Sequence, residues 1–472
     1  MKKFHQADTL TTFVSATDPW QLPKDRLYDL SDTPIIERQK QQESAVRSYP
    51  RRLPLAIKKA KGSRVMDERN QVFLDCLACA GALPLGHNHP EVTASITEAI
   101  KALCPWQTLD ITSPAKDAFT SGILSCFPKP FAKNARLQFC GPSGADAVEA
   151  AIKLAKTATQ RQSIISFQGG YHGMTHGALA LTGNLSAKRP LSGLMPDVHF
   201  MPYPYPFRSA FGEKNNDNAK ACLHYLRSQL LDPEGGITKP AAIIVEIVQG
   251  EGGVIPAPIA WLQGLRELTT QLGILLIVDE IQTGIGRTGH LFAFERAEIT
   301  PDIVILSKAI GGGLPLSVIA FDEAIDAWSP GAHAGTFRGN QLAFVSGLKT
   351  LEIIQRDRLY QNADLQGAQI KSKLQAMQQQ YPQIGEVRGQ GLMLGIEIVC
   401  ADEAVDDLGH LQADAAFAQK VQLEALKRGL ICELGGRFGA VIRLLPPLII
   451  TAQEAEFITD TLSQAFAAAA SV

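Results

Sequence analysis

The chain has 472 residues, of which 45% are hydrophobic and 19% are charged. This is enough apolar material for a large core, and we expect two closely joined domains. The 45 basic residues nearly cancel the 47 acidic ones, and a formal charge of -2 gives no global field that would attract nucleic acid. The expected partners are therefore small molecules rather than nucleic acid or a membrane.

Two further features of the composition concern location and metals. Behind Met1 the sequence is too polar for a secretory signal, and no stretch offers the roughly 18 apolar residues of a membrane span. We therefore expect a cytoplasmic protein. Cys76 and Cys79 form a C-x-x-C pair that could belong to a redox or zinc site, but packing in the apolar run 73–82 is favoured because no second pair follows. No metal and no disulfide framework are expected.

The chain divides into four expected segments. Residues 1–40 are polar and lack clean periodicity, which indicates an extension. Residues 41–100, with short strands expected at 65–67 and 71–75, would form the N-terminal part of a small domain. Residues 101–345 would form a large domain, and residues 346–472 the C-terminal part of the small domain.

Within the large domain, apolar strands alternate with helical stretches. The expected strands lie at 163–167, 242–246, 275–279 and 303–306, and a helix is expected at 261–272. This alternation predicts an α/β fold with a doubly wound, mainly parallel sheet. The small domain would be α+β, with a strand at 391–398 and an alanine-rich helix near 465–470.

Two charged residues follow neighbouring strands of this sheet. Asp279 ends one apolar run, and Lys308 follows the next, directly before a glycine-rich turn at 311–313. Either could be a cap or a solvated surface charge, but ligands of open α/β sheets bind at the carboxyl ends of strands. A nucleophilic lysine with an acidic partner is what a protein contributes to pyridoxal-phosphate chemistry.

A candidate anion site precedes the helix that starts near residue 144. The amides of Ser143, Gly144 and Ala145, the helix dipole and the Ser143 hydroxyl could hold a phosphate dianion. A plain serine cap is an equally good interpretation of these residues alone.

The ordered motifs resemble those of the class III pyridoxal-phosphate aminotransferases over about residues 45–450. They are Gly86–Pro90, Ser143–Glu149, Tyr171–Gly173, Gln249–Gly253, Val278–Gly284, Ser307–Lys308 and Thr336–Phe337. The resemblance implies the fold-type I transferase architecture, pyridoxal 5'-phosphate as cofactor, and a homodimer with shared active sites.

The resemblance also implies roles for single residues. Lys308 would bond to the cofactor and move the substrate proton, while Asp279 keeps the ring nitrogen protonated. Gln282 would hydrogen-bond to the ring 3-oxygen, and Tyr171 would stack on the ring with His172 beside it. The remaining expected cofactor contacts are Ser143, Gly144, Ala145, Glu246 and, across the dimer interface, Thr336.

Substrate binding is assigned to three residues. By the resemblance, Glu251 and Arg443 form a gate: they pair with each other until 2-oxoglutarate arrives, and Arg443 then takes its carboxylate. Arg338 stands in a Thr-Phe-Arg-Gly-Asn run where many relatives have Thr-Phe-Gly-Gly-Asn. That run is similar to diaminobutyrate:2-oxoglutarate aminotransferases, although Arg338 could only make an intersubunit ion pair.

The expected reaction therefore moves the 4-amino group of L-2,4-diaminobutanoate to 2-oxoglutarate, giving L-aspartate 4-semialdehyde and L-glutamate. Transamination of 4-aminobutyrate or of ornithine or acetylornithine is the alternative within the class. An aminomutase of the glutamate-1-semialdehyde type would need no gate, and a non-catalytic role would leave Lys308 and Asp279 without a purpose.

Overall fold

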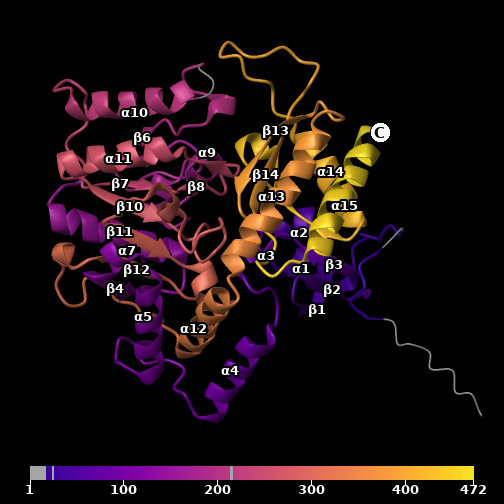
Figure 1. Cartoon of the computed structure of the whole chain (residues 1–472), viewed down its shortest axis with the longest axis horizontal. Helices are drawn as coiled ribbons and strands as arrows, with labels where there is room; N and C mark the ends of the chain where they lie inside the picture. Colours follow the sequence, from indigo (N-terminus) through magenta and orange to yellow (C-terminus); the bar gives the residue numbers. More distant parts are fainter. Residues whose placement is uncertain (1–17, 24–25, 213–215, 472) are drawn as a thin grey trace, which may run out of the picture.

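A computed structural model describes residues 18–23, 26–212 and 216–471 of the chain. The molecule has two lobes (Figure 1). The larger lobe contains a seven-stranded sheet, and the smaller lobe combines both ends of the described chain. Within the described residues, we find no helix that combines the length and the apolar character required to cross a membrane.

The large sheet has the strand order β4-β12-β11-β10-β7-β5-β6. Its strands are β4 (Ala135–Phe139), β5 (Ile164–Phe167), β6 (Val198–Met201), β7 (Ala242–Val245), β10 (Leu275–Asp279), β11 (Ile303–Leu306) and β12 (Val318–Asp322). Six of these strands run in the same direction, and β12 runs antiparallel to both of its neighbours, β11 and β4. The predicted mainly parallel sheet is confirmed, as are the four expected strands.

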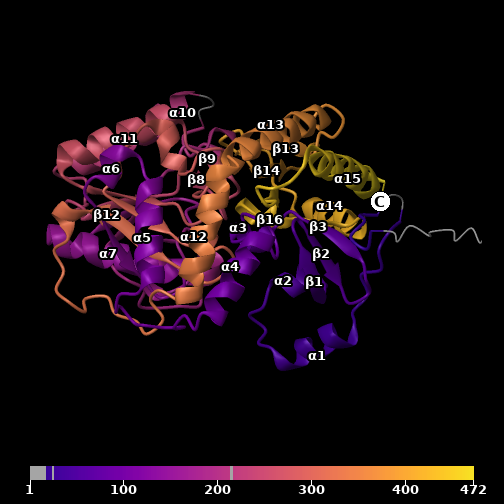
Figure 2. The ribbon, with the colours of Figure 1, turned by 60° about the horizontal axis from the view of Figure 1, so that its bottom comes forward.

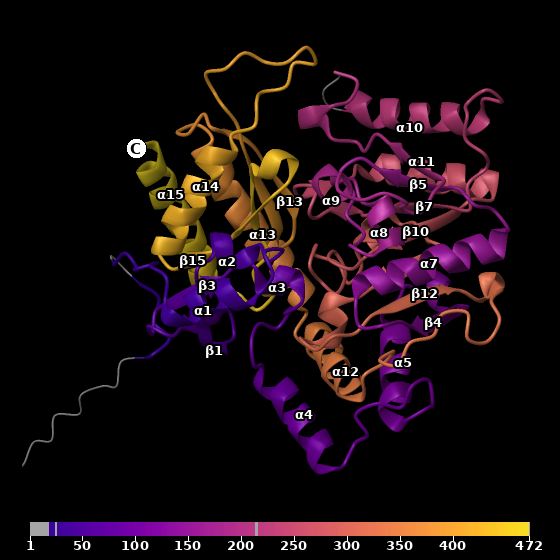
Figure 3. The same cartoon turned by 180° about the vertical axis from the view of Figure 1, so that it is seen from behind.

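Alternate residues of the central strands point to two different apolar cores, because side chains of a strand alternate between the faces of the sheet. Ile277 and Ile303 pack with α7 (Gly144–Thr159) on one face. Leu276 and Val278 face the other core, which contains α11 (Ile259–Leu272) and α5 (Pro114–Cys126). The view from behind shows α7 and α8 (His176–Leu181) across one face of the sheet (Figure 3).

The smaller lobe is built on two four-stranded sheets. One comprises β1 (Ile57–Lys61), β2 (Arg64–Asp67), β3 (Val72–Asp75) and β15 (Leu430–Ile431), and the other β13 (Ile384–Gln390), β14 (Met393–Ile398), β17 (Val441–Leu444) and β16 (Glu433–Gly435). Its main helices are α13 (Leu359–Met377), α14 (Ala415–Lys427) and α15 (Ala452–Ala470). The expected α+β unit is thus present.

The remaining elements are mostly connections. They are α1 (Pro34–Gln42), α2 (Tyr49–Arg52), α3 (Ala78–Gly81), α4 (Pro90–Lys101), α6 (Lys129–Ala132), α9 (Leu185–Lys188), α10 (Asn216–Leu231), α12 (Gln341–Arg356) and the hairpin β8 (Val248–Gln249) with β9 (Ile255–Pro256). Helix α12 packs against α4 and α5 and leads into the smaller lobe (Figure 2).

Two of the expected segment boundaries, at residues 40 and 345, fall inside helices. Residues 1–17 of the expected extension lie outside the described residues, and its limit at residue 40 falls inside α1. The limit at 345 falls inside α12, and that at 100 lies one residue before the end of α4. We propose the division into 41–100, 101–345 and 346–472 as a working description of the two domains.

Candidate active site

A cavity of about 410 Å³ opens at the carboxyl ends of β10 and β11. Ten of the residues predicted to bind cofactor or substrate line it: Ser143, Gly144, Ala145, Tyr171, His172, Glu246, Glu251, Asp279, Gln282 and Lys308. Sites at this edge of an open α/β sheet are the rule. The predicted site residues thus come together from five separate parts of the chain.

Asp279 is the buried acid of the cavity. It ends β10, where its Oδ1 accepts a hydrogen bond from the Ile281 amide at 3.0 Å. Its Oδ2 lies 2.8 Å from Nδ1 of His172, which is buried as well. The two side chains hold each other in place, so the carboxylate keeps one orientation toward the cavity.

Lys308 follows β11, the strand next to β10. Its backbone φ of +47° lies in the left-handed region, which costs a non-glycine residue free energy and is common at functional sites. Burial lowers the pKa of its amine, although the carboxylates of Glu251 and Asp279 act in the opposite direction. A larger fraction of neutral, nucleophilic amine follows.

The N-terminus of α7 forms the anion-binding side of the cavity. Ser143 caps this 16-residue helix, and its Oγ accepts from the Ala145 amide at 3.3 Å. A Cβ atom added at Gly144 would lie only 2.8 Å from Cδ1 of Ile281, so a larger residue would have to displace the end of that side chain. Free amides and the helix dipole make this a favourable place for a phosphate.

Glu246 joins two loops of the site. Its Oε1 accepts from the Tyr171 amide at 2.8 Å, and its Oε2 accepts from the Gly250 amide at 3.0 Å. Burial raises the pKa of this carboxyl to about 7. Glu246 therefore fixes the backbone beneath Tyr171 and at the start of the turn that carries Glu251.

Arg443 lies next to the cavity and is fully buried on β17. Its Nη1 is 2.8 Å from Oε1 of Glu251, as the predicted gate requires, and its Nη2 donates to Oε1 of Gln282 at 3.0 Å. The amide of Gln282 also donates to the Ala80 carbonyl at 3.1 Å. Burial acts to raise the pKa of Glu251, but Arg443 and Lys308 outweigh it and lower that pKa.

A second acid at Arg443 is absent from the sequence prediction. Oε2 of Glu433 lies 3.1 Å from the same Nη1 atom. Glu433 stands directly opposite Arg443 in the antiparallel β16–β17 pair. Strand β16 has only three residues, so no periodicity in the sequence indicates this pairing.

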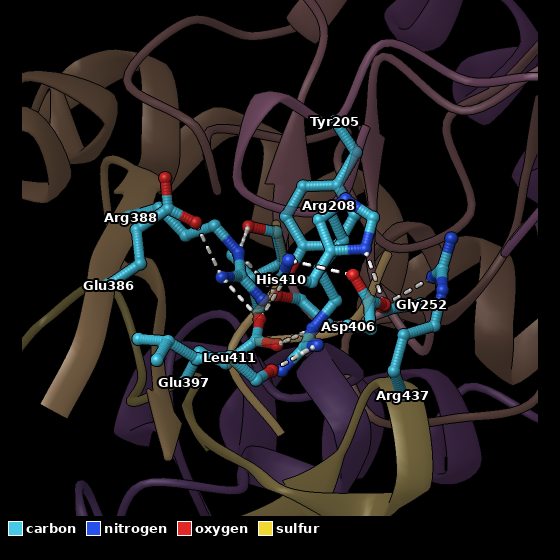
Figure 4. Close-up of polar contacts among 12 residues, drawn as sticks. Tyr205, Arg208, Gly252, Glu386, Arg388, Glu397, Asp406, His410, Leu411 and Arg437 are labelled. Carbon is cyan, nitrogen blue, oxygen red and sulfur yellow. Dashed lines mark hydrogen bonds and ion pairs between the residues drawn. The ribbon is translucent and has the colours of Figure 1, made fainter. Parts of the chain in front are cut away.

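A buried ionic cluster holds the loop 203–208 of the large lobe against the smaller lobe (Figure 4). Glu397 on β14 pairs with Arg388 at 2.7 Å and also binds Arg208 and the Tyr205 hydroxyl. Glu386 pairs with Arg388 at 2.7 Å. Burial would lower the pKa of Arg388, but the surrounding acidic groups raise it.

The same cluster clamps the turn that carries Glu251. Arg388 donates through Nε and Nη2 to the Gly253 carbonyl at 2.9 and 2.6 Å, and Arg437 donates to the Gly252 carbonyl at 3.0 Å. The Gly436 amide donates to the Glu251 carbonyl at 2.9 Å. The backbone at Glu251 is thus fixed, and only its side chain, which is 33% exposed, is free to turn.

Thr336 and Arg338 lie outside this cavity. Thr336 is exposed, while Arg338 pairs with Asp110 at 2.7 Å and donates to the His333 carbonyl at 3.1 Å. Arg338 lines a separate hollow with Phe139. Within one chain, neither residue contributes to the site that Lys308 and Asp279 form.

The cysteines, and one group of three side chains that could bind a metal ion, concern the expectation of no disulfide framework and no metal. All eight cysteines are free, with Cys76 buried and Cys79 exposed. Cys140, Asp146 and His333 lie within metal-binding distance of one another. However, Asp146 already accepts from the Gly141 amide and His333 lies 3.0 Å from it, and burial raises the pKa of the Cys140 thiol. Hydrogen bonding accounts for this group.

The cavity suits pyridoxal 5'-phosphate group by group. The α7 N-terminus matches the phosphate, Asp279 the protonated ring nitrogen, and Lys308 the aldehyde. Tyr171 offers an aromatic side chain on the cavity wall. The donor set therefore fits the cofactor that the sequence motifs predict.

Comparison with known proteins agrees with this site. The family model of class III aminotransferases matches residues 46–466. A diaminobutyrate--2-oxoglutarate aminotransferase of Rhizobium meliloti (strain 1021) is 52% identical, covering 91% of this chain and 92% of its own length. One of the same name from Haemophilus influenzae is 50% identical, covering 90% and 93%.

Solved structures agree as well. An amine transaminase from an uncultivated Pseudomonas species, determined in its PLP-bound form, superposes with a TM-score of 0.80 at 30% identity, covering 90% of this chain and 98% of that one. An ornithine aminotransferase from Toxoplasma gondii gives 0.76 at 26% identity, covering 93% and 94%. This chain belongs to the class III aminotransferases, which are pyridoxal-phosphate-dependent transaminases of fold type I.

Proposed function

We propose that this enzyme transfers the 4-amino group of L-2,4-diaminobutanoate to 2-oxoglutarate, reversibly, giving L-aspartate 4-semialdehyde and L-glutamate. The observation that carries the proposal is the extent of similarity: relatives named for this reaction share half of all residues over nine tenths of the chain. The Glu251–Arg443 pair supports two dissimilar substrates using one site in turn.

Each residue of the cavity has a proposed task. Bound pyridoxal phosphate supplies an electron-withdrawing ring that makes the C–H bond beside the substrate nitrogen acidic. The Lys308 amine would hold the cofactor through its aldehyde group, and the same amine would move the proton from the substrate carbon. Asp279, oriented by His172, keeps a proton on the ring nitrogen.

The other residues bind and exclude water. Ser143, Gly144 and Ala145 hold the phosphate, Gln282 hydrogen-bonds to the ring oxygen, and Tyr171 covers the ring. Glu246 acts through the two loops that it joins. When 2-oxoglutarate enters, the Glu251 side chain turns away and Arg443 takes the substrate carboxylate in a two-pronged grip.

We also propose a homodimer in which Thr336 binds the phosphate in the neighbouring subunit's site. Large apolar side chains are exposed along 103–111 and at the adjacent loop 336–341, namely Leu103, Trp106, Leu109, Ile111 and Phe337. The Arg338–Asp110 pair and the Gln341 amide, which donates to the Trp106 carbonyl at 3.3 Å, join these segments. An exposed apolar patch of this kind is typical of a subunit interface. Arg338 is proposed to act on substrate choice from this loop.

The proposed site of action is the cytoplasm. Its support is the set of eight free cysteines, five of them buried, which suits a reducing compartment.

Measured rates with several amino donors test the proposed reaction. The purified holoenzyme is given 2-oxoglutarate with L-2,4-diaminobutanoate, 4-aminobutanoate or L-ornithine, and glutamate is quantified. We expect kcat/KM for diaminobutanoate to exceed the others by at least about tenfold, since recognition of an added polar group discriminates strongly. Equal or higher values for 4-aminobutanoate or ornithine would contradict the proposal, and a Lys308→Ala variant should form no glutamate with any donor.

A further inference from the structure

Arg443 stands between two carboxylates that differ in freedom of movement. Glu251 comes from a turn, lines the cavity and is partly exposed. Glu433 is 6% exposed and is fixed opposite Arg443 by the backbone register of β16 and β17. When Glu251 turns away from Arg443, Glu433 must therefore stay.

The Glu433 carboxylate has unused binding capacity. Its Oε1 accepts a hydrogen bond from the Tyr49 hydroxyl at 2.7 Å. Its Oε2 is buried and, among the described residues, accepts no hydrogen bond, because the N–H groups of Arg443 do not point at it. A buried carboxylate oxygen without a donor is costly, so this atom is a place where a ligand's N–H group would be stabilised.

The charge balance at Arg443 also favours binding of a cation. Two carboxylates share one guanidinium, which gives an excess of one negative charge when both are ionised. Burial and the neighbouring Glu251 raise the pKa of Glu433, while Arg443 lowers it. When Glu251 and Glu433 are both ionised, the site therefore lacks one positive charge that a ligand could supply.

Tyr49 provides the approach to this carboxylate. The residue is 46% exposed, while its hydroxyl reaches Glu433. The pKa of this hydroxyl is raised by burial and by the same two acids, Glu433 and Glu251. Glu251, which pairs with the same Nη1 atom of Arg443 as Glu433 does, lines the cavity, so Glu433 lies one ion pair away from the cavity wall. A substrate whose reacting end lies at Lys308 would place its far end on this side.

We propose that Glu433, held by Tyr49, is the subsite for the 2-ammonium group of a diamino acid donor. This inference rests on the proposed function and names the group that separates 2,4-diaminobutanoate from 4-aminobutanoate. The ammonium donates to the free Oε2 of Glu433 and balances the excess charge. Glu433 thereby selects the amino donor, whereas Arg443 serves the carboxylate of 2-oxoglutarate.

A Glu433→Gln variant of the holoenzyme tests this assignment in separate half-reactions. The amide keeps the shape and the contact with Tyr49 but removes the charge. We expect kcat/KM for diaminobutanoate to fall at least tenfold, mainly through KM, because the charged hydrogen bond is lost. The ratio of this value to that for 4-aminobutanoate should fall as well, and Tyr49→Phe should lower it in the same direction by a smaller factor. Glu424→Gln, on the helix α14, is the matched control.

The outcomes separate this inference from the proposed function. If wild-type enzyme does not use diaminobutanoate, the proposed function fails, and the pair L-ornithine and 5-aminopentanoate, which differ by the same ammonium, still tests Glu433. If Glu433→Gln slows all donors equally, or slows only the 2-oxoglutarate half-reaction, Glu433 merely orients Arg443 and the inference is wrong. If kcat/KM of Glu433→Gln is unchanged for every donor, the charge of Glu433 takes no part in donor binding, and this also overturns the inference.

Discussion

The central residues of the site differ in how far the sequence reveals them. Asp279 and Lys308 each follow a wholly apolar run, so their position at the sheet edge is predictable from the chain. Glu433 is not, because only the register of a three-residue strand brings it to Arg443. The role of Glu246 in joining two loops likewise depends on contacts with distant amides.

Glu280, next to Asp279, gives a prediction about pH. It is 1% exposed, accepts from the Phe294 amide at 3.0 Å and from Thr283, and burial raises the pKa of its carboxyl to about 7. The unfolded chain therefore loses this proton at lower pH than the folded enzyme, and stability falls as pH rises from about 4.5 to 7. The full effect is on the order of 3 kcal/mol.

A Glu280→Gln variant should remove this dependence. We expect its unfolding midpoint to rise relative to wild type as the pH increases from 4.5 to 7, and to change no further above that range. Thermal unfolding of both holoenzymes at several pH values measures the difference, with Glu352→Gln on α12 as an exposed control. A constant difference across this range would show that Glu280 is ionised in the folded enzyme.

At the scale of elements, the sequence predicts those strands of the large sheet that are buried on both of their faces. The strands β7 and β11 are uninterrupted apolar runs, and β5 and β10 carry one polar residue each, because helices cover both sides of the sheet. The edge strand β4 carries Arg136 and Gln138, which break such a run. Strand β12 is apolar, but it follows the glycine-rich turn without an intervening helix, so the alternation of strands and helices does not predict it.

The sequence does not predict which strands pair when they lie far apart in the chain. Strand β15 pairs in parallel with β3, although more than half of the chain separates them. Local patterns indicate that each strand exists but not which strand lies beside it. Helix α1 is not predicted for another reason. Only Ile36 of this helix is buried, so its apolar periodicity is weak, and the signals at its start are Thr33 and Pro34 alone.

At the scale of the whole molecule, the exposed apolar patch at 103–111 and Phe337 gives a prediction about assembly. Leu103 is 87% exposed and Phe337 is 58% exposed. Replacing either by aspartate would put a charge into the proposed subunit interface, and we expect the dimer to dissociate. Activity should fall by about tenfold or more, since each site would lose the Thr336 of its neighbour.

Sedimentation of the holoenzyme, measured together with glutamate formation, checks this expectation. Leu231→Asp is the matched control, because Leu231 is 50% exposed at the end of α10, away from α4 and the patch (Figure 1). A wild-type protein that sediments as a monomer, or a Leu103→Asp variant that stays dimeric and fully active, would contradict the proposed interface.

The proposed reaction depends on Lys308 forming the bond to pyridoxal phosphate in the cavity beside Asp279. The most direct measurement is to reduce the purified holoenzyme with borohydride, which makes that bond permanent, and then to map the modified peptide by mass spectrometry. We predict that the added mass lies on Lys308 alone and that it is absent after reduction of a Lys308→Ala variant. Modification of a different lysine, or of none, would contradict the account.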